Sequence, residues 1–159
     1  MSILVLGLGN QVMTDDALGG RVIEVLQQRF VFPDHVCLLD GGTLGLDLLP
    51  RFEGINKLLV VDALEMGAEG GTIFRLADEE VPRAFANKLS VHQMGLQDLL
   101  AVSELQGHLP PELVVWGAQS ESIEMGTELS EAMAPALEKI IAAVVKELSA
   151  WGAAPLRVT

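Results

Sequence analysis

Ile3-Leu-Val-Leu-Gly-Leu8 is the stretch that decides the fold class of this 159-residue chain, because it is apolar throughout and ends in glycines. A run without polar alternation is typical of a parallel strand that is buried on both faces. Lys57-Leu-Leu-Val-Val-Asp-Ala63 has the same character, and so has the stretch 113–118. The sequence therefore predicts a sheet whose central strands are covered on both sides.

The segments between these strands carry the apolar spacing of helices, which we expect over residues 18–30, 44–49, 92–105 and 130–148. Ser130 is expected to cap the last helix, with Pro135 in its first turns. Further short strands are expected at 36–39 and 72–76, and the second of these could run antiparallel. Strands that alternate with helices predict a mostly parallel α/β sheet in a single domain over 1–159. The tail from about residue 152 is expected to be loosely ordered.

Composition and charge exclude several classes of partner. Ten basic and 22 acidic residues give a formal charge of −12, which argues against binding to nucleic acid or to anionic membranes. No apolar run approaches the roughly 18 residues of a membrane helix. The single cysteine, Cys37, excludes an intrachain disulfide and fits a reducing cytoplasm. Its apolar neighbours favour a buried, packing role over a nucleophile.

Polar side chains gather where the predicted strands end, which is where doubly wound sheets bind ligands. They are Asp15, Asp16, Asp40, Asp62, Glu121 and Glu124, and His92 at the start of a predicted helix. Asp62 is the most informative, because it interrupts a buried strand in which a carboxylate without a partner is costly. An apolar-rich chain thus places several carboxylates at one edge of its sheet.

Most of these residues also have an ordinary structural interpretation. Asp15 or Thr14 is expected to cap the following helix, and Asp16 could be a first-turn carboxylate favoured by the helix dipole or a ligand. Asp40, before two glycines, could be a turn residue. A lone histidine such as His92 is more often structural than functional. The two other histidines, in turn-like segments, are interpreted as surface residues: His35 and His108.

Nucleotide binding is the rival interpretation of the glycines after the first strand. Gly7-Leu8-Gly9 resembles the start of a dinucleotide-binding turn, but the third glycine of that pattern would fall at Val12. The next predicted helix also begins too late to place its N-terminus on a pyrophosphate. Walker lysine, HExxH and GxSxG patterns do not occur, which removes the common phosphate-binding, zincin and serine-hydrolase interpretations.

Four motifs resemble those of the nickel-iron hydrogenase maturation proteases, in the family's order and spacing. They are Ile3–Asn10 with Thr14-Asp-Asp-Ala-Leu-Gly19, Leu39-Asp-Gly-Gly-Thr43, the strand ending at Asp62, and Asn87-Lys-Leu-Ser-Val-His-Gln-Met-Gly-Leu96. The resemblance extends from residue 1 to about 148. It implies a three-layer α/β/α sandwich with a mixed five-stranded sheet.

The resemblance also implies an endopeptidase that removes the C-terminal extension of the hydrogenase large-subunit precursor after nickel insertion. The metal-contacting positions of the family map onto Asp16, Asp62 and His92, and its Asp-Gly-Gly-Thr loop onto residues 40–43. Two carboxylates and one imidazole suit a borderline divalent ion such as nickel, which we expect the substrate to carry. Three protein ligands leave coordination positions open.

Two other classes of function stay open at the level of the sequence. One is a nickel-binding chaperone or checkpoint module that never cleaves. The other is a nucleotide-binding α/β protein. The sequence does not decide whether the metal polarises the scissile carbonyl or only orients it, nor whether an aspartate activates water.

Overall fold

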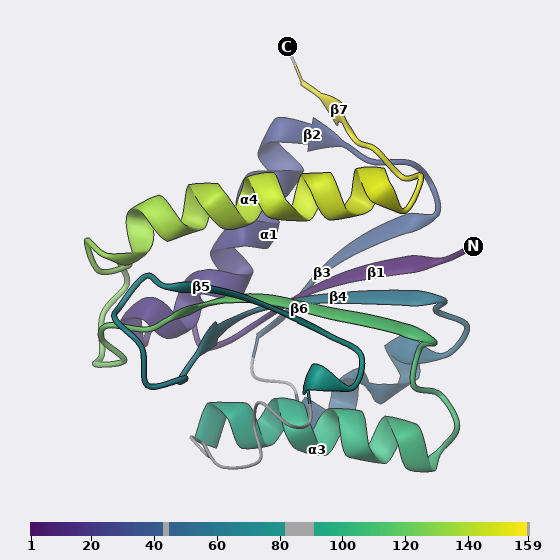
Figure 1. Ribbon diagram of the computed structural model, residues 1–159, viewed down its shortest axis with the longest axis horizontal. Helices are drawn as coiled ribbons and strands as arrows, with labels where there is room; N and C mark the ends of the chain where they lie inside the picture. The colour runs from purple at the N-terminus through teal and green to yellow at the C-terminus, as the bar shows by residue number, and fades with distance from the viewer. Residues whose placement is uncertain (43–44, 82–90, 159) are drawn as a thin grey trace.

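A five-stranded mixed sheet forms the centre of the protein (Figure 1). The computed structural model describes residues 1–42, 45–81 and 91–158, and the side chains of residues 91–97 lie outside its described part. The strand order is β3-β1-β4-β6-β5, and only β5 runs antiparallel to its neighbour. The strands are β1 (Ile3–Leu8), β3 (Val36–Gly42), β4 (Lys57–Leu64), β5 (Ile73–Ala77) and β6 (Glu112–Gln119).

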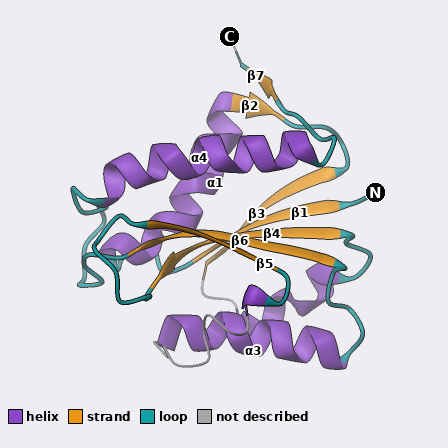
Figure 2. Ribbon diagram, viewed as in Figure 1, coloured by secondary structure: helices purple, strands orange, loops and turns teal. Residues whose placement is uncertain are grey.

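Helices cover both faces of this sheet (Figure 2). One face carries α1 (Leu18–Arg29) and α4 (Met133–Ala150), and the other carries α3 (Val91–Leu105) and the 3-10 helix η2 (Gly45–Phe52). A single 3-10 turn, η1 (Thr14–Ala17), leads from β1 into α1. The α/β/α sandwich and the mixed five-stranded sheet implied by the resemblance are therefore confirmed.

The continuous apolar runs are explained by two separate cores. Successive side chains of a strand point to opposite faces, so β1 sends Ile3 and Val5 toward α1 and α4, and Leu4 and Leu6 toward η2 and α3. Strand β4 divides its side chains in the same way. By this alternation Asp62 lies on the face that α3 and η2 cover.

Two close approaches place the start of α1 at the carboxyl end of the sheet. A Cβ on Gly19 would lie 2.3 Å from the carbonyl oxygen of Leu8 and 2.5 Å from that of Val61. A Cβ on Gly9, whose φ is +125°, would lie 1.8 Å from the carbonyl oxygen of Asp16. Only glycine fits at both positions. The glycines after β1 thus let the chain's own turn η1 pack against the sheet.

An ion pair fastens α4 to the antiparallel edge of the sheet. The guanidinium of Arg75 in β5 lies 2.8 Å from the carboxylate of Glu147 in α4. The indole N–H of Trp116 in β6 donates to the same carboxylate at 3.1 Å. Hydrogen bonding from Arg75 holds the pKa of Glu147 below its ordinary value.

Some predicted elements differ in their boundaries or type. The helix expected at 44–49 is a 3-10 helix that continues through Pro50 to Phe52, and Leu44 lies outside the described residues. The last helix begins at Met133, so the prediction that Ser130 caps it is wrong. Pro135 does lie in its first turn, as expected.

The chain after residue 152 has more structure than the expected loose tail. Ala153 is buried, and β7 (Leu156–Arg157) pairs antiparallel with β2 (Phe30–Val31), which follows α1 (Figure 1). This pairing joins the two helices of one face at their ends. Among the residues that the structure describes, none of the helices has the length and apolar character needed to span a bilayer.

Candidate active site

The carboxyl ends of the four parallel strands meet at one edge of the sheet, and the predicted site residues lie on elements at that edge (Figure 1). Asp16 lies in η1, directly after β1, and Asp62 lies near the end of β4. Asp40 lies near the end of β3. His92 is the second residue of α3, whose far end leads back to the start of β6.

Asp62 is fully buried, unlike Asp16 and Asp40. Its residue has no exposed surface, and it lies opposite Gly117 in the parallel pairing of β4 with β6. A Cβ on Gly117 would lie 2.5 Å from the Asp62 carbonyl oxygen, so glycine keeps this part of β6 close to β4. A carboxylate is costly to bury, and Asp62 lies at the carboxyl end of the parallel strands. This position favours a chemical role for Asp62 over a packing role.

Asp16 is held by the loop that precedes it. Its Oδ2 accepts a hydrogen bond of 2.9 Å from the backbone N–H of Asn10, and the residue is partly exposed. The glycine at position 9 makes this short loop possible. Backbone contact therefore fixes the direction of the Asp16 carboxylate while part of the side chain still faces solvent.

Asp15 has a role that the sequence did not predict. It is fully buried, and its carboxylate accepts four hydrogen bonds of 2.7–2.9 Å: from the backbone N–H groups of Glu121, Ser122 and Ser130, and from the hydroxyl of Ser130. The first turn of α1 has no side-chain cap, so the capping prediction for Asp15 is wrong. Asp15 instead ties η1 to the loop after β6.

The two neighbouring carboxylates therefore point to different partners. Both oxygens of Asp15 are engaged by donors of the 120–130 loop, whereas Asp16 contacts the loop after β1. Four donors occupy the lone pairs that Asp15 would need to bind a metal. This arrangement favours Asp16 over Asp15 as the carboxylate offered to a ligand.

Replacing Asp15 by Ala should destabilise the fold strongly. The change would leave the three backbone N–H groups and the Ser130 hydroxyl without their common acceptor. Hydrogen bonds to a charged group contribute about 1.5–3 kcal/mol each, and their loss is not additive, so we expect a loss of roughly 3–5 kcal/mol. Thermal unfolding followed by circular dichroism should show a melting temperature lower by about 10 °C. An exposed carboxylate, Asp34, provides the control, and an Asp15→Ala melting temperature equal to that of Asp34→Ala would contradict this role.

The convergence of the three predicted ligands remains a prediction. The backbone of His92 lies in the first turn of α3, but its side chain lies outside the described part of the structure. Among the described side chains no three His, Cys, Asp or Glu groups gather as a metal site, and that set omits His92. The structure thus places Asp16, Asp62 and the backbone of His92 on elements at one edge of the sheet.

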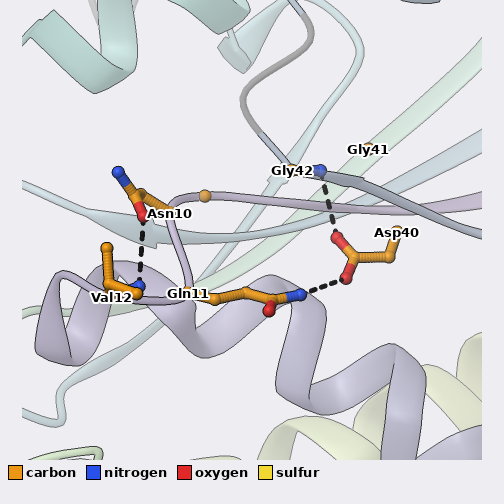
Figure 3. A pocket seen from close by; sticks show the side chains of 7 residues that line it. Asn10, Gln11, Val12, Asp40, Gly41 and Gly42 are labelled. Atoms are coloured by element: carbon orange, nitrogen blue, oxygen red, sulfur yellow. Dashed lines mark hydrogen bonds between the residues drawn. The ribbon is translucent and has the colours of Figure 1, made fainter. Parts of the chain in front are cut away.

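A pocket of about 440 Å³ lies between the loop after β1 and the end of β3 (Figure 3). Asp40 forms one wall: its Oδ1 accepts from the N–H of Gly42, and its Oδ2 accepts from the side-chain amide of Gln11, both at 3.0 Å. The first bond is that of a turn residue, as one interpretation expected. The second joins two loops, which sequence reasoning missed. Thr43, the last residue of the predicted motif, lies outside the described residues.

Gln119 is a further residue of this edge that the sequence did not single out. It is buried at the end of β6, and its side-chain oxygen accepts from the backbone N–H groups of Met66 and Ala68. Its amide nitrogen donates to the Glu65 carboxylate at 2.8 Å. Gln119 thereby fixes the loop that follows Asp62.

Cys37 does not have the buried role that its apolar neighbours predicted. It is exposed, because β3 is an edge strand of the sheet, and its sulfur lies 3.6 Å from the guanidinium of Arg51. The two histidines assigned to the surface differ in degree: His108 is exposed and His35 is half-buried. Cys37 and His35 lie on the edge strand and at its start, away from the carboxyl ends of the central strands.

Known proteins identify the family. The profile of the hydrogenase maturation protease family matches residues 20–147. The hydrogenase 2 maturation protease of Escherichia coli K12 is 44% identical over 149 residues, which cover 91% of each chain.

Solved structures agree with this match. The hydrogenase maturating endopeptidase HybD from E. coli superposes with a TM-score of 0.93 at 39% identity, over 99% of this chain and 98% of that one. The [NiFe] hydrogenase maturation protease HybD from Thermococcus kodakarensis has a TM-score of 0.77 at 26% identity, over 92% and 99%. These matches set aside the chaperone and nucleotide-binding alternatives. The chain belongs to the hydrogenase maturation protease family and is an endopeptidase of that family.

Proposed function

We propose that this endopeptidase hydrolyses one peptide bond near the C-terminus of the large-subunit precursor of a nickel-iron hydrogenase, after nickel has been inserted. Its membership of the maturation protease family supports the substrate class, and so does the similarity to a protease described as acting in [NiFe] hydrogenase maturation. The buried carboxylate of Asp62 at the functional end of the sheet is the single structural observation on which the proposal depends most.

The nickel belongs to the substrate in this proposal, and Asp16, Asp62 and His92 are the residues that contact it. The partly exposed Asp16 and the first turn of α3 lie at the edge where the precursor would approach. Two carboxylates and one imidazole suit a borderline divalent ion, and three protein ligands leave positions for the precursor's own ligands. The nickel would orient or polarise the scissile carbonyl when it is present.

The protein's own side chains then orient and desolvate the reacting groups. The N–H of Asn10 fixes one oxygen of Asp16, and burial removes Asp62 from bulk water. In hydrolysis a water molecule adds its oxygen to the carbonyl carbon and passes a proton to a base, and the C–N bond then breaks as a proton is delivered from that base to the leaving amine nitrogen. A carboxylate of this pair would serve as that base, in the manner of an aspartyl protease. A cytoplasmic setting accompanies the proposal, since the exposed thiol of Cys37 suits a reducing compartment.

The test is to incubate the purified enzyme with nickel-loaded large-subunit precursor and to record the intact mass of both products. We expect one cleavage, with a single C-terminal peptide released and the remainder of the precursor intact. An unchanged precursor mass after prolonged incubation, or several cleavages along the precursor, would refute the proposed reaction.

A further inference from the structure

Backbone hydrogen bonds join two loops at the carboxyl ends of the parallel strands, the loop after β1 and the loop after β6. The N–H of Gly126 donates to the carbonyl of Val12 at 2.9 Å, and the N–H of Thr14 donates back to the carbonyl of Gly126 at 3.0 Å. The N–H of Asp15 donates to the carbonyl of Ser122 at 3.0 Å, and the buried Asp15 carboxylate adds its four bonds. The loop after β1 and the loop after β6 are therefore held together in a fixed arrangement (Figure 1).

These joined loops present three large apolar side chains to solvent. Val12 is 50% exposed, Ile123 is 54% exposed and Met125 is 85% exposed. We call these three residues the apolar ledge. Exposed apolar groups on a well-ordered backbone mark interaction surfaces, because they are already arranged for a partner and bury apolar area when it binds. Val12 lies two residues before η1, the turn that carries Asp16, and the bridge between Met13 and Gly126 brings the loop of Met125 beside it.

The loop that carries Ile123 and Met125 is acidic. Glu121, Glu124 and Glu128 are exposed on the same loop, and the sequence contains no lysine or arginine between Lys88 and Lys139. The cation that reaches this loop among the described residues is Arg21, whose guanidinium donates to the carbonyl of Thr127. The apolar ledge thus shares its loop with exposed carboxylates.

We propose that the apolar ledge is the docking surface for the folded hydrogenase precursor, and that the precursor offers it an apolar patch bordered by lysine or arginine. This inference rests on the proposed function, since it places the precursor next to Asp16. A second copy of this chain fits poorly, because it would bring the same carboxylates, on a chain of net charge −12, against one another. A precursor with a basic rim would pair with those carboxylates instead.

The experiment measures both steady-state processing and equilibrium binding of nickel-loaded precursor. Met125→Glu and Ile123→Glu should each raise KM and the dissociation constant by about tenfold, with kcat within about twofold of wild type, because they change docking and not the reacting groups. Met125→Ser, which adds no charge, should raise both constants by about threefold. Replacing Glu121 and Glu124 together by Gln should reduce the salt dependence of binding.

Leu105→Glu is the matched control. Leu105 is 87% exposed, close to the value for Met125. It lies at the end of α3, which leads back to the amino ends of the parallel strands. The docking inference would be overturned if KM and the dissociation constant of the ledge variants stayed within about twofold of wild type. It would also be overturned if Leu105→Glu raised both constants as much as the ledge variants do. So would a self-associated enzyme, seen by analytical ultracentrifugation, that Met125→Glu makes monomeric. If the wild-type enzyme bound the precursor without cleaving it, the proposed reaction would be refuted. The dissociation constants of the variants would still decide whether the apolar ledge binds the precursor.

Discussion

Asp62→Asn and His92→Ala are expected to abolish processing of the nickel-loaded precursor while the fold survives. In the proposed site each residue contributes a contact to the metal beside the scissile bond. If removing such a contact raises the free energy of the transition state by about 3 kcal/mol or more, the processing rate falls by at least about a hundredfold. Asn keeps nearly the size of the buried Asp62 side chain and removes only its charge, so packing around β4 should persist. Initial rates from intact-mass assays give the effect directly.

Two controls separate chemistry from stability in this comparison. His108→Ala removes an exposed imidazole after α3 and should process at the wild-type rate. Cys37→Ser should also process normally, since the exposed thiol lies on the edge strand away from the proposed site. Full processing by Asp62→Asn or His92→Ala, with an unchanged circular dichroism spectrum, would remove that residue from the site.

The second large effect concerns the form of the precursor that is cleaved. We expect the resting enzyme to carry little nickel and to cleave nickel-loaded precursor more than about a hundredfold faster than nickel-free precursor. A thiolate-free set of two carboxylates and one imidazole, if it bound metal tightly, would also retain zinc and copper. A weak site avoids this competition and gains affinity when the precursor supplies the remaining ligands. A differential contribution of about 3 kcal/mol would suffice for the hundredfold discrimination.

The measurement combines metal analysis of enzyme purified without added metal with processing of both precursor forms. Asp16→Ala should lose much of the discrimination, whereas Asp34→Ala, which removes an exposed carboxylate before β3, should retain it. Stoichiometric, tightly held nickel in the free enzyme would make the metal a resident cofactor. Equal cleavage of the nickel-free precursor would make it irrelevant to recognition.

Sequence alone determined the layers of the fold and the place of the proposed site. Strands buried on both faces produce unbroken apolar runs, and β1 and β4 could be read from that local pattern. Parallel strands bring their carboxyl ends to one edge, so the sequence pattern assigns Asp16 and Asp62 to that edge. Only the family motifs selected Asp16, Asp62 and His92 as a set. Local periodicity does not distinguish a metal ligand from a residue that caps a helix.

Only the tertiary structure decided which residues far apart in the chain come into contact. The four bonds of Asp15 join residues 106 to 115 positions apart in the chain, and no local pattern reports such contacts. The exposure of Cys37 follows from the position of β3 at the edge of the strand order, which the apolar stretch around it does not encode. Val12 and Met125 likewise become parts of one surface only because the loops after β1 and β6 pair in space. Local sequence patterns identify strands and helices, whereas the partners of a residue and its place in the sheet are set by how distant segments pack together.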